Sequence, residues 1–130
     1  MKVLRSIGAV VAGYLVLGMS AELLFALSGH NPHAPASLAF IALTAIYGFF
    51  FAALAGRLAA RISGRLELFH AAVLACLTAL VAMLSLLADL GSGAVWSQLV
   101  VLIIMAPAVM IGAMIRLKRT DKMSRSAVQR

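Results

Sequence analysis

The chain has 130 residues, of which 64% are hydrophobic and 12% are charged, and its formal net charge is +7. A soluble domain usually has about 45–50% apolar and about 25% charged residues, so this composition excludes an ordinary water-soluble domain and predicts that lipid surrounds much of the chain. The positive charge would suit nucleic acid or an anionic membrane surface, and we expect the membrane and no nucleic acid, because the basic residues flank apolar segments.

Four apolar segments are each long enough to cross a bilayer as an α-helix, which needs about 20 residues. They cover residues 6–27, 38–58, 69–90 and 95–115, and short connections rich in Gly, Pro, Asn and Ser separate them. Strands are excluded because an open sheet would leave backbone groups unpaired in hydrocarbon. The sequence therefore predicts an all-α, polytopic membrane protein: one four-helix transmembrane domain over residues 1–120 and a basic, flexible tail over residues 121–130.

The first segment has a second interpretation. Residues 1–20 combine a basic start, an apolar stretch and the small-residue sequence Gly18-Met19-Ser20, which is typical of a cleaved signal peptide. Cleavage would leave three helices with the same charge bias. We expect the helix to be retained, because its apolar run continues to Leu27 and reaches spanning length.

All eleven basic residues fall on one side of the four predicted helices. They are Lys2, Arg5, Arg57, Arg61, Arg65, Arg116, Lys118, Arg119, Lys122, Arg125 and Arg130. Loops rich in Lys and Arg stay in the cytoplasm, so both termini are predicted to be cytoplasmic. Six of these residues are expected to meet anionic headgroups on that side: Arg57, Arg61, Arg65, Arg116, Lys118 and Arg119.

Helices in lipid associate through small residues, so the faces that carry them predict the packing. At 100° per residue, the small face of the first helix holds Gly8, Ala12, Leu15, Met19, Glu22 and Ala26. The second helix has Gly48, Ala52 and Ala55 on one side and bulky residues on the other. Pro107 predicts a kink in the fourth helix, because it removes a helical hydrogen bond.

Glu22 is the first candidate for chemistry, since ionisable residues inside membranes are costly and usually functional. It shares the small face of its helix, so we expect it to point into the bundle. There it could form a proton or cation site with Asp89 and Gln98, which lie toward the same side of the membrane. Alternatively, Glu22 reaches the outer interface or only holds a neighbouring helix.

His30 and His33 could join the two carboxylates in binding a divalent metal such as zinc. Histidines are also ordinary loop residues, and we expect no metal and no cofactor. The sequence has no P-loop, no Rossmann glycine pattern, no G-x-S-x-G, no H-E-x-x-H and no C-x-x-C. We therefore expect a protein that is not an enzyme.

Several features together resemble small uncharacterised bacterial inner-membrane proteins of four helices. These features are the Gly13 to Glu22 stretch, Gly48-x7-Gly56-x3-Ala60-Arg61-Ile62, His70, Pro107 and Gly112-Ala113. The resemblance covers nearly the whole chain and implies a bacterial inner (plasma) membrane location, but no activity.

The chain is also similar to small multidrug-resistance transporters, which have four helices and a functional acid in the first. That resemblance implies Glu22 as the coupling acid. Glu22 is shallower than the acid of that family, and the third helix has Phe69 as its only aromatic residue.

The sequence thus predicts a non-enzymatic accessory or structural membrane protein that packs with itself or with another membrane protein. The alternative is a small proton- or cation-coupled transporter that uses Glu22.

Overall fold

The computed structural model of the chain describes residues 2–91 and 94–129. The elements are α1 (Lys2–Ser28), α2 (Leu38–Ser63), α3 (Glu67–Asp89), α4 (Trp96–Val100), the π-helical segment η1 (Val101–Met105) and α5 (Ala106–Val128). α4, η1 and α5 follow one another directly and form one long helix, which we call the fourth span. The described chain therefore has four helices that are long and apolar enough to cross a membrane, as the sequence predicts.

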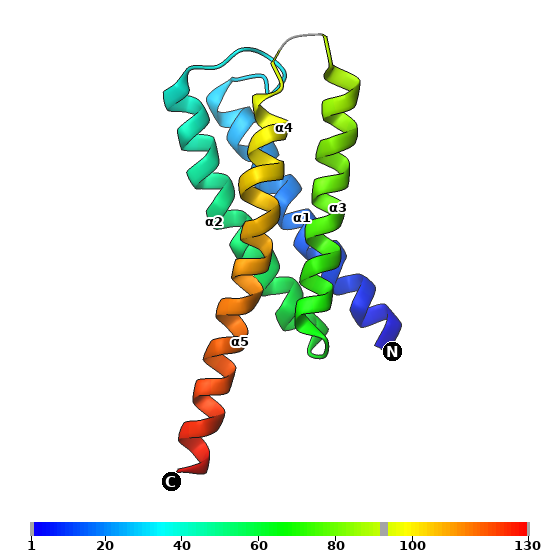
Figure 1. Ribbon diagram of the computed structural model, residues 1–130, viewed down its shortest axis with the longest axis vertical. Helices are drawn as coiled ribbons and strands as arrows, with labels where there is room; N and C mark the ends of the chain where they lie inside the picture. The colour runs from blue at the N-terminus through cyan, green and yellow to red at the C-terminus, as the bar shows by residue number, and fades with distance from the viewer. Residues whose placement is uncertain (1, 92–93, 130) are drawn as a thin grey trace.

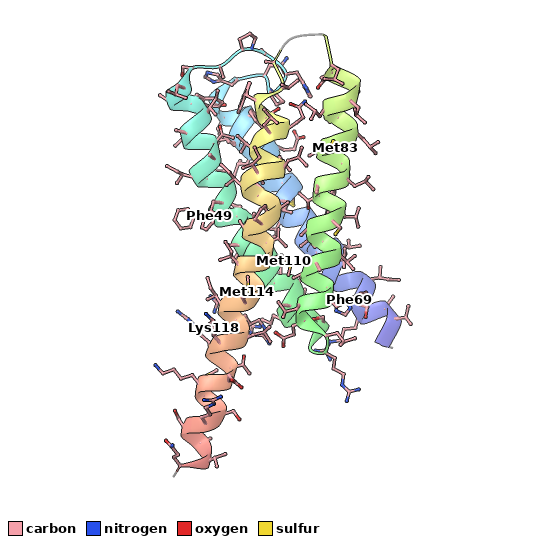
Figure 2. All side chains as sticks on the ribbon, in the orientation of Figure 1. Phe49, Phe69, Met83, Met110, Met114 and Lys118 are labelled. Atoms are coloured by element: carbon pink, nitrogen blue, oxygen red, sulfur yellow. The ribbon has the colours of Figure 1, made fainter. Side chains whose placement is uncertain are left out.

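The four spans alternate in direction, so their ends gather at two ends of the bundle (Figure 1). The basic end carries the start of α1, the α2–α3 turn over residues 64–66 and the end of α5. The loop end carries the 29–37 connection, the end of α3 and the start of α4. Figure 2 shows many side-chain nitrogens around the basic end, whereas the middle of the bundle is almost entirely carbon. The one-sided distribution of basic residues in the sequence thus becomes a separation of charge between the two ends of the folded molecule.

α2 lies at the centre of the packing and makes its most extensive contacts with α1 and α5. Its buried residues are Thr44, Gly48, Ala52, Ala55, Gly56, Ala59, Ala60 and Ser63. A Cβ on Gly56 would collide with the backbone of Val109, and a Cβ on Gly112 would collide with the backbone of Ala53. The small face predicted for α2 is therefore confirmed, and it is used for packing within one chain.

α1 packs through a different face from the predicted one. Its buried residues are Ala9, Gly13, Leu17 and Ser20. Gly8, Leu15, Met19, Glu22 and Ala26 are all exposed, and this face is rotated by about 130° from the buried one. Gly13 decides the orientation, because its missing side chain leaves room for Leu74 and brings α1 close to the backbone of Ala55. Small residues occur on more than one side of α1, so their pattern alone does not show which side is buried. The predicted buried face was therefore wrong.

The fourth span changes its hydrogen-bond pattern directly before Pro107. Pro107 has no N–H, and its ring would clash with the carbonyl four residues earlier in a regular α-helix. The N–H of Ala106 bonds the carbonyl of Val101, five residues earlier, which widens the turn into a π-helix. Where the sequence predicts a kink, the structure has this wide turn, which sets the rotation of α4 relative to α5.

All four spans extend beyond their predicted bounds at the basic end. α1 begins at Lys2, α2 continues to Ser63, α3 begins at Glu67 and α5 continues to Val128. The long stems of Arg and Lys allow a helix to continue past the apolar core while the charged groups reach water. Most of the segment expected as a flexible tail thus has helical geometry, and its mobility stays a prediction.

Candidate functional site

A cluster of polar side chains lies at the loop end, where three segments meet. Asp89 is the last residue of α3, His33 belongs to the 29–37 connection, and Gln98 lies in the first turn of α4. Gln98 is only 4% exposed, Asp89 is half-buried and His33 is exposed. We call Ser85, Asp89, His33, Ser97 and Gln98 the loop-end cluster.

Asp89 is the centre of the loop-end cluster. Its Oδ2 lies 2.7 Å from His33 Nδ1 and 2.6 Å from Gln98 Nε2. The same Gln98 amide donates to Ser85 Oγ at 3.3 Å, one turn earlier on α3. Hydrogen bonds to a carboxylate are short and strong, so Asp89 connects α3 to both the fourth span and the connection.

The proton positions in the cluster follow from the carboxylate, which only accepts hydrogen bonds when ionised. His33 Nδ1 must therefore carry the proton that faces Asp89. Its 3.4 Å contact with Gln98 Nε2 then joins two donors and is not a hydrogen bond. The orientation of the Gln98 amide is set in the same way. Exchanging its oxygen and nitrogen would place Oε1, an acceptor, against the Asp89 carboxylate, which is also an acceptor.

The 29–37 connection is held against α4 by two further hydrogen bonds. Ser97 Oγ lies 2.8 Å from the carbonyl of Pro32, and Trp96 Nε1 donates to the carbonyl of Ala34 at 2.8 Å. The Trp96 ring packs edge-on against Phe40, with 6.0 Å between the ring centroids. Backbone and aromatic contacts together hold His33 over the end of α3 and the start of α4.

A cavity of about 250 Å³ lies on the membrane side of the cluster, between α1, α3 and the fourth span. Its wall is largely apolar, with Leu17, Ala82 and Met105 among the lining residues. Ser85, Ser97, Gln98 and His33 also line it. A mostly apolar cavity with a few convergent polar groups is typical of sites that bind small molecules.

Glu22 does not join the cluster. It is exposed on α1, while its neighbours Ala21 and Phe25 line the cavity. The structure therefore brings together Asp89 and Gln98 of the predicted proton or cation site, but not Glu22. The expectation that Glu22 points into the bundle is wrong, because α1 packs through its opposite side; a role in transport stays a prediction.

The two histidines of the connection have separate surroundings. His30 stacks on Phe40, with ring centroids 3.9 Å apart, and its Nδ1 lies 3.1 Å from the carbonyl of Ser28. His33 binds Asp89 instead. Among the residues that the structure describes, no three His, Cys, Asp or Glu side chains are placed to hold a metal ion.

A second charged contact, which the sequence did not indicate, lies at the basic end. Arg116 donates from Nε and Nη2 to the two carboxylate oxygens of Glu67, at 2.9 and 3.3 Å. This bidentate pair joins the start of α3 to α5. The other residues predicted to meet lipid headgroups, Arg57, Arg61, Arg65, Lys118 and Arg119, are exposed, and that role stays a prediction.

Sequence reasoning also missed Ser85, Trp96 and Ser97. The four-residue spacing from Ser85 to Asp89 places both on one face of α3 and could have indicated the first of them. The contacts of Trp96 and Ser97 depend on the path of the connection, for which the sequence has no comparable signal.

Comparison of the chain with known protein families, with curated proteins and with solved structures found no match.

Proposed function

We propose that the chain is a non-enzymatic accessory protein of the bacterial inner membrane that associates with a second copy of itself or with another membrane protein. The observation that carries this proposal is the exposed position of Glu22 on α1. Glu22 lies about 9 Å before the end of its helix, and it is the one charged residue of the 6–27 segment.

A carboxyl group that faces hydrocarbon is costly, so such groups usually face protein or a water-filled cavity. Glu22 faces away from the helices of its own chain, and an interface with a partner would supply hydrogen-bond donors. Association would therefore remove a cost that the single chain leaves in place.

The residues around Glu22 favour a protein contact over a purely lipid surface. Gly8 has no neighbouring atom within 4 Å of the position that a Cβ would occupy. It is therefore not needed for packing within the chain, whereas Gly13 on the opposite side is. Small residues on an outward face allow close approach by another helix. We call the exposed side that includes Gly8, Met19 and Glu22 the free face of α1.

The orientation of the chain across the membrane is part of the same proposal. The start of α1, the end of α5 and Arg65 of the α2–α3 turn lie at the basic end, which supports a cytoplasmic position for that end. The loop-end cluster would then face the periplasmic side.

Site-specific photo-crosslinking in native membranes tests the association. A photoreactive amino acid placed at Met19, which is 70% exposed on the free face, should form a protein adduct. An adduct of twice the chain mass identifies a second copy, and any other protein mass identifies a different partner. Adding Glu22→Leu should lower the adduct yield, because the partner then loses its polar contact.

Met83 on α3 is the matched control, since it is also a methionine and is 44% exposed. Position 83 should form lipid adducts only. Lipid adducts alone at position 19, or equal protein adducts at both positions, would contradict the proposal.

The alternative function is a small proton- or cation-coupled carrier, and the cavity beside the loop-end cluster favours it. Asp89 and Gln98 supply a carboxylate and a buried amide there, while Glu22 faces outward and would act from outside the cavity. The same crosslinking experiment separates the two functions, because a carrier that works as a single chain needs no protein at position 19.

A further inference from the structure

A basic pocket of about 520 Å³ lies between the end of α2 and the extension of α5. Its lining residues are Arg57, Arg116, Arg119, Thr120, Lys122, Met123 and Ser126. Four of the seven carry a positive charge, and none carries a negative charge. The pocket therefore has the electrostatic character of an anion site.

A second, apolar hollow of about 200 Å³ shares Arg57 with the basic pocket. Its other lining residues are Phe50, Ala53, Leu54, Gly112 and Ile115. Gly112 is the point at which α5 crosses the backbone of α2. The hollow lies farther from the basic end than the pocket does, because its α2 residues precede Arg57 and its α5 residues precede Arg116.

The cations of the basic pocket are only partly matched by carboxylates. Arg116 pairs with Glu67, and Arg125, outside the pocket, pairs with Asp121 at 3.6 Å. In the part of the chain that the structure describes, no salt bridge involves Arg57, Arg119 or Lys122. Three positive charges thus line one pocket without a salt-bridge partner among the described residues.

We propose that the two hollows together form a site for one anionic phospholipid. Its phosphate lies among Arg57, Arg119 and Lys122, and one acyl chain lies along Phe50, Leu54 and Ile115. The order of apolar hollow and then cations matches the order of acyl chain and then phosphate in a lipid. Basic pockets between membrane helices bind acidic headgroups in this way. The inference rests on the membrane spans alone and is independent of the partner proposed for the free face of α1.

Native mass spectrometry of the full chain in mild detergent tests the site. With dioleoyl phosphatidylglycerol and dioleoyl phosphatidylcholine at equal concentration, one phosphatidylglycerol per chain should remain bound in preference to phosphatidylcholine. The double variant Arg57→Gln/Arg119→Gln should weaken that binding roughly 25-fold, because each basic residue contributes about fivefold. Both residues are exposed, so the core is unchanged, and an unaltered far-UV circular dichroism spectrum checks the fold.

The matched control is Arg61→Gln/Lys118→Gln, which removes the same charge from the same two helices but lines neither hollow. This variant should retain the bound lipid. An equal loss in both double variants would mean delocalised surface attraction and would overturn the site, as would equal retention of phosphatidylcholine.

Two further probes separate a lipid from a free phosphate. Glycerol 1-phosphate at the same concentration should not displace the lipid, and dihexanoyl phosphatidylglycerol should bind more weakly than the dioleoyl form. Displacement by glycerol phosphate, or binding that does not depend on chain length, would overturn the part of the proposal that assigns the acyl chain.

Discussion

Gln98 is the residue on which the loop-end cluster depends most. It is 4% exposed, and its amide bonds both Asp89 and Ser85 on α3. Among the described residues, no buried side-chain nitrogen or oxygen lacks a hydrogen-bond partner. A buried polar group that loses its partner costs more than the bond itself contributes, so this network is sensitive to the removal of one member.

Gln98→Ala should therefore lower the free energy of unfolding by about 1–3 kcal/mol, because the variant loses the bonds to Asp89 and Ser85. Unfolding in mixed micelles of mild detergent and dodecyl sulfate, followed by far-UV circular dichroism, measures the change. Leu99→Ala is the control on the same helical turn, since Leu99 is 41% exposed. A loss at Leu99 as large as the loss at Gln98 would mean that the cluster adds no stability.

At the scale of the elements, the crossing of α2 and α5 shows what holds these helices together. Lipid tails are as apolar as leucine, so burial of apolar area drives helix association little inside a membrane. Close packing supplies the attraction instead, and Gly56 and Gly112 bring the two backbones into contact. Gly48 is less tight, because a Cβ there would lie 3.0 Å from the flexible Met105 side chain.

Gly56→Ala should separate α2 from α5 and lower the free energy of unfolding by about 1–3 kcal/mol, since the added methyl group meets backbone atoms that cannot rotate away. The same mixed-micelle unfolding experiment measures the effect. Gly18→Ala is the matched control, because nothing lies within 4 Å of its Cβ position. An equal effect of Gly56→Ala and Gly18→Ala on stability would show that α2 and α5 are packed less closely than the structure indicates.

At the scale of the whole molecule, the distribution of charge differs between the two ends of the helix bundle. The basic residues lie toward one end of the bundle, and the loop-end cluster, with its histidine and carboxylate, occupies the other. Positively charged ends stay in the cytoplasm during insertion, so this separation predicts one orientation of the chain.

Thiol labelling in a Cys76→Ala background checks that orientation. In intact spheroplasts, a membrane-impermeant maleimide should label Asn31→Cys in the 29–37 connection. It should label Ser124→Cys on α5 only after the membrane is permeabilised. The opposite pattern would overturn the cytoplasmic assignment of both termini, and labelling of both positions in intact spheroplasts would mean a mixed orientation.

The candidate site could be predicted only in part from the residues. Asp89 and Gln98 were found because polar residues at the ends of apolar helices are conspicuous, and alternating spans bring those ends together. Glu22 was placed wrongly, since a helical wheel gives angles around one helix but not the direction of its neighbours. The Arg116–Glu67 pair joins residues far apart in the sequence, and only their positions in the bundle show it.

The sequence by itself determined that this protein is all-α with four spans, because hydrocarbon requires every backbone group to be bonded within a helix and about 20 apolar residues reach across it. It also determined the separation of charge between the two ends. Only the tertiary structure decided which face of α1 is buried, how the fourth span turns at η1, and which polar groups meet at each end. Those features depend on contacts between surfaces from distant parts of the chain, where Gly13, Gly56 and Gly112 set how closely the helices approach.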